Sequence, residues 1–403
     1  MARADASPAL HLKAGREKSL LRRHPWIFSG AVDRVEGGAR SGDTVAVRTS
    51  AGAFVAWAAF SPQSQIRARV WSWDEAERID AAFFRARFRT AVAARAGFAA
   101  HGNAVRLVHG EADGLPGVAC DRYADVLVLQ FATAGAERWR EAIAEAALAE
   151  SGCGVAYERS DLDVRALEGL APRAGPLRGE PGGESREPAV EIAEHGLKYR
   201  VDVAHGQKTG FYLDQRANRD RVRALAAGRE VLNGFCYSGG FTLNALAGGA
   251  RSALSIDSSA PALALARANA ALNGLDDGRA EWLEADVFAA LRTLRDRGRT
   301  FDLVVLDPPK LAPTAAHAEK AARAYKDANL LAFKLLRPAG LLVTFSCSGG
   351  VSPELFQKIV AGAAADAGAD VRLRERLAAD ADHPVSLAFP EGEYLKGLVL
   401  EKR

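Results

Sequence analysis

The hydrophobic positions in the carboxyl-terminal half of the chain alternate between short apolar runs and longer stretches with helical spacing. Three of the apolar runs end in polar residues: REVLNGF (229–235), ALSIDS (253–258) and FDLVVLD (301–307). Stretches of helical periodicity separate them, such as APALALARANAALNG (260–274). Repeated strand–helix units of this kind predict a doubly wound parallel sheet. Ligands of such sheets bind beyond the carboxyl ends of the strands, where the polar residues fall.

The amino-terminal half of the chain has a different pattern. Residues 8–75 contain short alternating runs separated by turn residues, such as DTVAVRT (43–49), and predict a small, mostly β module. The next residues combine helical patterns with strand-like runs and predict a central α/β domain. This domain closes in a Pro-, Gly- and charge-rich stretch (173–188), which is interpreted as a loop or linker. The chain is therefore predicted to be α/β in class, with domains at 8–75, 76–188 and 189–403.

The composition is that of an ordinary soluble globular protein, with 48% hydrophobic and 26% charged residues. A net charge of +3 permits an anionic partner without requiring one. Near the amino terminus, basic residues surround a tryptophan. Such a cluster suits RNA, whose phosphates are neutralised while its bases stack on aromatic rings. The candidate RNA-binding residues are Lys13, Arg16, Lys18, Arg22, Arg23 and Trp26. A solvated basic face explains the same cluster equally well.

The four cysteines, Cys120, Cys153, Cys236 and Cys347, are widely separated along the chain. None of them forms a CxxC or Cys/His pattern with ligand spacing, so no metal site is predicted. Scattered thiols in a chain without a signal peptide predict a cytoplasmic protein in a reducing environment. No apolar run reaches the roughly 20 residues that span a bilayer, so no membrane partner is expected.

A glycine-rich turn, NGFCYSGG (233–240), follows the first strand of the predicted sheet. It allows the backbone to approach a ligand at a helix amino terminus, but it lacks the GxGxxG spacing of a dinucleotide site. Asp257 closes the next strand, where a carboxylate can accept hydrogen bonds from both ribose hydroxyls. Asp286 follows the third strand, where an adenine amino group would lie. Either acid could instead be a helix cap. Together the elements predict an S-adenosylmethionine (SAM) site formed by Asn233, Phe235, Ser238, Gly239, Asp257 and Asp286.

The segment QKTGFYLDQR (207–216) is polar and rich in aromatic residues and precedes the first core strand. A segment in that place can cover the methionine end of the cofactor, with aromatic rings near the sulfonium. Tyr212, Asp214 and Arg216 are therefore added to the predicted cofactor contacts. A surface turn that enters a helix, with Asp214 as its cap, is the equal alternative.

The run FDLVVLDPPK ends in a loop at 307–310. Many nucleobase methyltransferases use such a loop to present polar groups to a flipped base. The prolines fix the direction in which the Asp307 carboxyl group points. Protonated, or acting as a hydrogen-bond partner, this group can meet N3 of a cytosine and ease addition at carbon 6. Asp307 is also predicted to contact the cofactor. Enzymes that methylate exocyclic amines tend to carry an aromatic ring where Lys310 stands, so the lysine disfavours that chemistry.

A cysteine ends the next apolar run, GLLVTFSCS (340–348). Carbon 5 of cytosine is too weak a nucleophile to attack a sulfonium methyl group directly, but a thiolate added at carbon 6 makes it enamine-like. Cys347 is the predicted nucleophile, with Lys310 as a cation that lowers the pKa of its thiol. An inert core cysteine is the alternative. For removal of the carbon 5 proton, water, Lys310 and another group all stay open.

Several long segments carry a family resemblance, among them HGQKTGFYLDQRANR (205–219), FDLVVLDPPK (301–310) and DHPVSLAFPEGEYLKG (382–397). They resemble the ribosomal RNA large subunit methyltransferase I family, bacterial enzymes that form 5-methylcytidine in 23S rRNA. The resemblance implies an amino-terminal PUA domain, a central α/β domain and a carboxyl-terminal Rossmann-like class I methyltransferase domain. It also implies SAM as the cofactor, 23S rRNA as the partner and Cys347 as the nucleophile.

Two other functions stay open at this point. Relatives that share the FYLDQR and DPPK segments methylate other positions, including guanine N7, which is already nucleophilic and needs no thiol. The non-enzymatic alternative is an RNA-binding assembly factor whose methyltransferase domain has decayed. The intact DPPK and SCS segments disfavour decay. The sequence does not decide between a monomer and a homodimer.

Overall fold

The computed structural model describes residues 8–179, 189–312 and 318–403. The chain divides into two compact units, each built from several segments. The first unit consists of Met1–Ala193, Val201–Leu213 and Asp382–Gly392, and the second of Glu194–Arg200, Asp214–Ala381 and Glu393–Arg403. Three segments that the sequence pattern assigns to the methyltransferase domain, 189–193, 201–213 and 382–392, therefore belong to the first unit.

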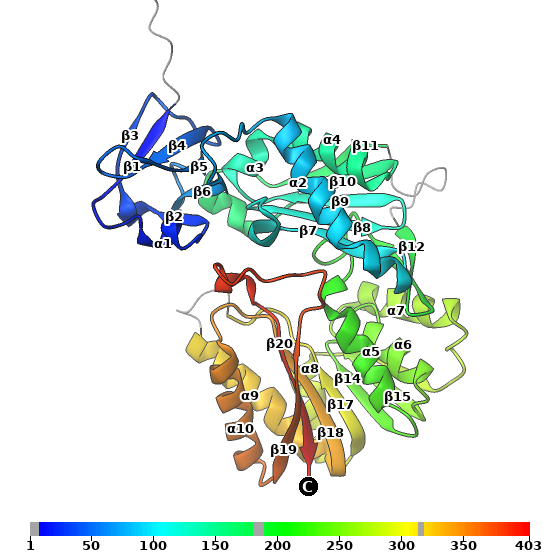
Figure 1. Ribbon diagram of the computed structural model, residues 1–403. Helices are drawn as coiled ribbons and strands as arrows, with labels where there is room; N and C mark the ends of the chain where they lie inside the picture. Colours follow the sequence, from blue (N-terminus) through cyan, green and yellow to red (C-terminus); the bar gives the residue numbers. More distant parts are fainter. Residues whose placement is uncertain (1–7, 180–188, 313–317) are drawn as a thin grey trace, which may run out of the picture. The chain divides into compact units, whose positions relative to one another are not determined.

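The first unit begins with a six-stranded sheet in the order β2-β6-β5-β4-β1-β3 (Figure 1). Neighbouring strands are antiparallel except for β1 and β4, which are parallel. Val45 and Val47, two residues apart on β4, enter one apolar core, as the alternation predicts. The elements are β1 (Ala9–Leu12), α1 (Lys18–Leu21), β2 (Trp26–Phe28), β3 (Val32–Glu36), β4 (Thr44–Arg48), β5 (Phe54–Phe60) and β6 (Ile66–Ser72).

The second sheet of this unit has five strands in the order β11-β10-β9-β8-β7. Helices α2 and α4 pack against each other and against this sheet, around Phe84, Phe88 and Ile143. Two consecutive helices of this unit, α3 and α4, are divided at Trp139. The elements are α2 (Ala81–Ala94), β7 (Ala104–His109), β8 (Val118–Tyr123), β9 (Val126–Phe131), α3 (Ala134–Arg138), α4 (Arg140–Ser151), β10 (Val155–Ser160) and β11 (Arg173–Arg178).

The prediction of a loop or linker over 173–188 is wrong for its first part. Residues 173–178 form β11, which pairs antiparallel with β10. Pro176 is tolerated there because β11 is an edge strand, where a proline need not interrupt a central ladder. Residues 180–188 lie outside the described residues.

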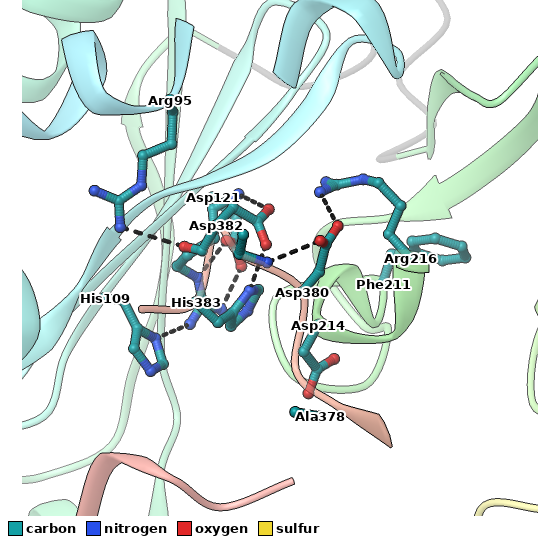
Figure 2. A network of polar contacts seen from close by, with 12 residues as sticks. Arg95, His109, Asp121, Phe211, Asp214, Arg216, Ala378, Asp380, Asp382 and His383 are labelled. Atoms are coloured by element: carbon teal, nitrogen blue, oxygen red, sulfur yellow. Dashed lines mark hydrogen bonds and ion pairs between the residues drawn. The ribbon is translucent and has the colours of Figure 1, made fainter. Parts of the chain in front are cut away.

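Polar contacts inside the first unit hold both of its later segments to the central sheet. Arg95 Nη2 donates to the Asp382 carbonyl (3.3 Å; Figure 2), and Asp382 Oδ2 accepts a hydrogen bond from the Arg106 amide (3.0 Å). Thr209 Oγ1 donates to Asp121 Oδ2 (2.5 Å). These contacts explain why segments 201–213 and 382–392 belong to this unit.

The second unit contains a seven-stranded sheet in the order β16-β15-β14-β17-β18-β20-β19. The first five strands of this order are parallel, and β20 is antiparallel to both of its neighbours. The predicted α/β fold with a Rossmann-like, doubly wound sheet is thus confirmed. The strands are β14 (Glu230–Gly234), β15 (Ser252–Asp257), β16 (Ala280–Glu284), β17 (Phe301–Leu306), β18 (Leu336–Ser346), β19 (Val371–Ala378) and β20 (Lys396–Lys402).

Helices cover both faces of this sheet (Figure 1). They are α5 (Arg216–Leu225), α6 (Gly240–Ala247), α7 (Ala260–Leu272), α8 (Val287–Asp296), α9 (Ala318–Leu335) and α10 (Pro353–Asp366). Alternate residues of β18 enter different cores. Leu342 packs in the core of α8, α9 and α10, whereas Val343 and Phe345 pack in the core of α5 and α6. Cys347 continues the second series and lies against the α5 and α6 core.

A hairpin of β12 (Ala189–Glu194) and β13 (Leu197–Asp202) precedes the seven-stranded sheet in the chain. Its turn residues, His195 and Gly196, have φ angles of 47° and 80°. Two consecutive positive φ angles are typical of the tight turns that match the twist of paired strands.

Across residues 8–179, 189–312 and 318–403, no helix combines the length and apolar character needed to cross a bilayer. The same residues contain no group of three or more histidine, cysteine, aspartate or glutamate side chains placed to hold a metal ion.

Candidate active site

Polar residues stand at the carboxyl ends of neighbouring strands in the second unit. Asp257 ends β15, Asp307 follows β17 and Cys347 follows β18. Between them, β14 runs into the glycine turn at Gly234. Because parallel strands end at one edge of a sheet, these residues share that edge, which we term the rim. The rim therefore gathers the predicted cofactor turn and the predicted chemical groups.

The turn between β14 and α6 has an unusual backbone. Phe235 and Tyr237 have φ angles of 63° and 46°, and Gly239, the N-cap of α6, has a φ angle of 83°. A left-handed conformation costs a non-glycine residue about 1–2 kcal/mol, and such strain clusters at functional sites. Asp257 stabilises the turn, because its Oδ2 accepts a hydrogen bond from the Tyr237 amide (2.8 Å). Its Oδ1 accepts one from the Ser259 amide (3.0 Å), at the start of α7.

Asn233 and Ser238 support this turn from inside the unit, where both are buried. Asn233 Nδ2 donates to Thr242 Oγ1 (2.8 Å) and so joins β14 to α6. The Ser238 carbonyl accepts a hydrogen bond from Asn269 Nδ2 (3.2 Å) of α7. These contacts show that both residues stabilise the conformation of the turn. A direct contact of either residue with the cofactor stays a prediction.

Phe235 and Asp286 both contact helix α8. The half-buried Phe235 ring meets the Phe288 ring of α8 edge to face, at a centroid distance of 5.8 Å. Asp286 is the N-cap of α8, with Oδ1 accepting a hydrogen bond from the Ala289 amide (2.8 Å). The helix-cap interpretation therefore holds for one carboxylate oxygen. An adenine contact through the other oxygen stays a prediction.

Asp214 and Arg216 are buried among polar partners of the second unit (Figure 2). Arg216 Nη1 donates to Asp380 Oδ2 (2.8 Å), and its Nε lies 3.7 Å from Glu194 Oε2. Asp214 Oδ2 accepts a hydrogen bond from the Tyr394 hydroxyl (2.6 Å). These contacts fix the start of α5, so both residues have a structural role. Their contact with the cofactor stays a prediction.

Tyr212 belongs to the first unit, because the division between the units falls after Leu213. Its hydroxyl donates to Gln207 Oε1 (2.5 Å), and the Lys208 ammonium lies 4.4 Å from the centroid of its ring. The ring is thus already engaged by a cation, the kind of contact predicted for the sulfonium. Its contact with the cofactor also stays a prediction.

Asp307 is oriented by side-chain amides that the sequence did not reveal. Gln215 Nε2 donates to Asp307 Oδ2 (2.9 Å). Asn218 Nδ2 in turn donates to Gln215 Oε1 (2.6 Å) and to the Ala378 carbonyl (2.9 Å). Gln215 and Asn218 are buried, so each amide has a fixed direction. The position of Gln215 inside the FYLDQR segment was the signal that could have identified it.

The Cys347 thiol is held at the rim by its two serine neighbours. Ser346 Oγ donates to the Tyr325 hydroxyl (3.0 Å), which also hydrogen-bonds Ser348 Oγ (2.9 Å). Both serines are buried, while Cys347 is half-buried. Cys347 Sγ lies 3.9 Å from the Pro308 carbonyl of the 307–310 loop. The alternation of the strand thus buries the serines in one core and leaves the thiol beside the predicted catalytic loop.

The other three cysteines are poor nucleophiles. Burial raises the pKa of the thiols of Cys120, Cys153 and Cys236. For Cys236, in the cofactor turn, the nearby Asp257 carboxylate adds to this effect. A neutral thiol attacks carbon weakly, because the thiolate is the reactive form. Of the four cysteines, Cys347 alone is not buried.

Two lysines of the second unit lie close to the segments that contain Asp307 and Cys347. Lys310 is exposed at the end of the 307–310 loop. Lys396, at the start of β20, is buried, and its Nζ donates to the carbonyls of Ser348 (2.7 Å) and Val351 (2.8 Å). Lys396 was not predicted from the sequence. Its signal was a lysine at the head of an otherwise apolar strand, KGLVL.

The predicted RNA-binding residues lie in the first unit. All five basic side chains are exposed. Two of them contact neighbouring residues of the same unit. Lys13 Nζ donates to the Gly30 carbonyl (3.2 Å), and the Arg23 guanidinium lies 5.2 Å from the centroid of the Trp73 ring. Trp26 is instead half-buried. Its Nε1 donates to Glu111 Oε1 (2.8 Å), which ties the ring into the unit. The basic side chains are therefore accessible, whereas Trp26 is part of the packing of the first unit.

Comparison with known proteins places the chain in a family. Residues 177–388 match the model of S-adenosylmethionine-dependent methyltransferases, and residues 10–73 match that of PUA-like domains. A ribosomal RNA large subunit methyltransferase I from Shewanella denitrificans is 50% identical over 396 residues, covering 97% of this chain and 98% of the relative. A relative with the same name from Klebsiella pneumoniae is 50% identical over 393 residues, covering 97% of each chain. The chain belongs to the ribosomal RNA large subunit methyltransferase I family. This resemblance, inferred from the sequence segments, is thereby confirmed.

Solved structures agree on the fold of this member of the ribosomal RNA large subunit methyltransferase I family. A protein from Streptococcus mutans assigned as a SAM-dependent methyltransferase covers 97% of this chain and 100% of its own, with a TM-score of 0.83 and 23% identity. A methyltransferase complexed with S-adenosylhomocysteine (SAH) covers 98% of this chain and 99% of its own, with a TM-score of 0.85 and 23% identity.

The cofactor of the chain is SAM, as its family assignment states and as the sequence predicted. The rim fits this molecule. The strained turn presents backbone at the amino end of α6, and Asp257 offers a carboxylate to ribose hydroxyls beside it. When bound, SAM supplies an electrophilic methyl group. Asp257 would hold its ribose, and the 235–239 turn would lie against it.

Replacement of Asp257 by alanine is expected to weaken the binding of SAH by about 10- to 100-fold. Each hydrogen bond to a charged group contributes about 1.5–3 kcal/mol, and about 1.4 kcal/mol is tenfold in affinity. The turn also loses the acceptor of the Tyr237 amide. Calorimetric titration with SAH measures the effect. Asp277→Ala, which removes an exposed carboxylate paired with Arg279, is the control. Equal dissociation constants for the two variants would exclude Asp257 from the site.

Proposed function

We propose that this protein methylates carbon 5 of a cytosine in 23S ribosomal RNA, through a covalent bond between Cys347 and carbon 6 of the base. The observation that carries the proposal is the placement of Cys347. It is a half-buried thiol at the rim, fixed between two anchored serines and 3.9 Å from the catalytic loop. The names of the 50% identical relatives support ribosomal RNA of the large subunit as the substrate.

The chemistry requires a nucleophile at this place. Attack of Cys347 Sγ on carbon 6 forms a carbon–sulfur bond and moves the electron pair of the C5–C6 double bond onto carbon 5, which can then accept the methyl group. In its protonated form Asp307, held by Gln215, donates a hydrogen bond to N3, where negative charge develops as the thiolate adds, and so eases the attack. Loss of the carbon 5 proton then restores the double bond and releases the thiolate as the carbon–sulfur bond breaks. Lys310 and water both stay open as acceptors of that proton.

The first unit supplies a surface suited to the RNA. Its 10–73 segment matches PUA-like domains, and the exposed basic side chains lie within that segment. Lysine and arginine side chains neutralise phosphates and make binding depend steeply on salt. We assign these basic residues to RNA contact and Trp26 to their support. The cytoplasmic location stays a prediction.

Nucleoside analysis tests the proposed product. Purified protein is incubated with labelled SAM and 23S rRNA from a strain that lacks the protein, and the nucleosides are separated by mass spectrometry. Label in 5-methylcytidine is expected. Label in a methylguanosine would overturn the proposal in favour of chemistry that needs no thiol. Absence of any label, despite SAH binding, would favour a non-catalytic RNA-binding protein.

A further inference from the structure

We propose that Lys396 is a positioning residue for Cys347: its buried ammonium fastens the loop that carries the thiol and favours the thiolate form. The inference rests on the proposed function, since it concerns the reactivity of the proposed nucleophile. Lys396 lies within the family segment 382–397 but outside the glycine turn, the DPPK loop and the SCS segment, and no chemical role was predicted for it.

The position of Lys396 follows from strand register. Lys396 pairs directly with Ser346 across the antiparallel β18 and β20 strands, so their side chains lie on the same face of the sheet. From there its Nζ reaches past the end of β18 to the carbonyls of Ser348 (2.7 Å) and Val351 (2.8 Å). These two carbonyls bracket the loop between Cys347 and α10. Lys396 therefore closes the loop from one side.

The Tyr325 hydroxyl secures the same loop from α9, through Ser346 and Ser348. The Ala312 amide adds a third fastening, because it donates to Ser348 Oγ (2.9 Å). A loop held at its backbone and its side chains leaves Cys347 with little freedom. A reacting group that is held in a fixed geometry reacts faster, because less conformational entropy is lost on the way to the transition state.

The charge of Lys396 acts on the thiol as well. Burial lowers the pKa of Lys396, and the nearby positive charge of Lys310 adds to this effect, whereas the charges of Cys347 and Glu393 act in the opposite direction and favour the ammonium. An interaction of this kind is reciprocal: if the thiolate stabilises the ammonium, the ammonium stabilises the thiolate by the same free energy. Two carbonyl acceptors also favour the charged amine over the neutral one.

Other ionisable groups near this place do not replace that cation. They are Asp307 and Lys310 from the loop after β17, Tyr325 from α9, and Glu393 and Tyr394 from the segment before β20. Burial raises the pKa of Tyr325, so it is a neutral phenol at pH 7. Lys310 carries the same charge as Lys396 but is exposed, and water screens an exposed charge far more than a buried one.

Strand β20 offers a matched control in Lys402. Its Nζ also donates to two backbone carbonyls, those of Phe333 (2.9 Å) and Leu336 (2.7 Å). Burial alone lowers its pKa, with no contribution from Cys347. Lys396→Met and Lys402→Met therefore remove the same kind of hydrogen bonds, and only the first removes a cation that interacts electrostatically with Cys347.

The test measures the alkylation rate of Cys347 by iodoacetamide against pH, with the labelled peptide identified by mass spectrometry in the full-length protein. Since the thiolate reacts, the midpoint of the profile reports its formation. In Lys396→Met the midpoint is expected to rise by about one pH unit, which slows alkylation about tenfold at pH 7. Lys402→Met is expected to keep the wild-type midpoint. Equal midpoints in all three proteins would overturn the proposal.

A second variant separates charge from fastening. Lys396→Gln keeps an N–H donor for the loop carbonyls but removes the charge, and it is expected to show the same rise of the midpoint. It also keeps the test decisive if Lys396→Met fails to fold. In methylation assays the turnover of Lys396→Gln should fall about tenfold at pH 7 and recover at higher pH, with an unchanged KM for RNA. A loss of turnover that does not recover with pH would overturn the electrostatic role.

Alkylation needs neither RNA nor SAM, so it is independent of the proposed function. If the product is a methylguanosine, the proposed function fails whatever the alkylation profiles show. If the product is 5-methylcytidine and Lys396→Gln retains the wild-type midpoint, the proposed function stands and the role of Lys396 fails.

Discussion

Replacement of Cys347 by alanine is expected to reduce methyl transfer to RNA by on the order of 10⁴-fold or more, because a step that depends on a nucleophile has no substitute when that nucleophile is removed. SAH affinity is expected to remain unchanged, since the thiol lies at the end of β18 and the cofactor turn follows β14. Single-turnover methylation with labelled SAM and calorimetric titration with SAH give the two quantities on one preparation.

A covalent trap makes this prediction sharper. In RNA carrying 5-fluorocytidine, carbon 5 has no proton to lose after it accepts the methyl group, so the bond between Cys347 and carbon 6 persists. Wild-type protein is expected to form a denaturant-resistant RNA adduct at the peptide that contains Cys347, and Cys347→Ala is expected to form none. Cys153→Ala, which removes a buried thiol of the first unit, should behave like wild type. Adduct formation or full activity in Cys347→Ala would refute the mechanism.

The part of the site that the sequence predicted consists of residues at strand ends. Asp257, Asp307 and Cys347 each close an apolar run, and the period of those runs identifies them as strands of one parallel sheet. Because the carboxyl ends of parallel strands lie at the same edge of a sheet, the sequence pattern alone predicts that all three residues lie at the rim. The SCS segment also shows its own orientation, because alternate residues of a strand face opposite sides. The buried serines and the half-buried thiol follow from that alternation.

The groups that orient these residues could not be predicted in the same way. Gln215 lies 92 positions from Asp307, and Lys396 lies 48 positions from Ser348. Such pairs depend on strand register and on the path of loops, which hydrophobic periodicity does not determine. For the same reason the ion pair between Arg216 and Asp380 was not foreseen. The contact of Arg216 with the cofactor stays a prediction. Strand β11 was missed because its proline- and glycine-containing sequence is typical of a loop and is tolerated at a sheet edge.

A buried ion pair of the second unit has the largest expected effect on stability. Arg219 of α5 donates through Nε and Nη2 to the two carboxylate oxygens of Glu194 (2.7 and 2.6 Å), and both side chains are about 3% exposed. Arg219 also packs beneath the start of α6, since a Cβ at Gly240 would lie 2.9 Å from its Cδ. The pair therefore supports the helix that begins at the cofactor turn.

Arg219→Ala is expected to lower the free energy of unfolding of the second unit by up to about 3–5 kcal/mol, because the buried Glu194 carboxylate loses its hydrogen-bonded partner. Arg216, whose Nε lies 3.7 Å from Glu194 Oε2, remains as a weaker ion pair. Hydrogen exchange of peptides from β14 and α6 across a urea series measures this in the second unit alone. Arg221→Ala is the matched control on the same helix. Its pair with Glu375 is 38% and 35% exposed, so its loss should cost no more than about 1 kcal/mol.

A double variant distinguishes a buried-charge penalty from a simple loss of packing. In Arg219→Met with Glu194→Leu no charge is left uncompensated, and apolar side chains fill the space. The double variant should therefore be more stable than Arg219→Ala, although it removes more polar groups. If it is as unstable as Arg219→Ala, or if Arg219→Ala unfolds like Arg221→Ala, the ion pair does not support the unit as argued. Because α6 begins at the cofactor turn, SAH affinity should rise and fall in the same order as these stabilities.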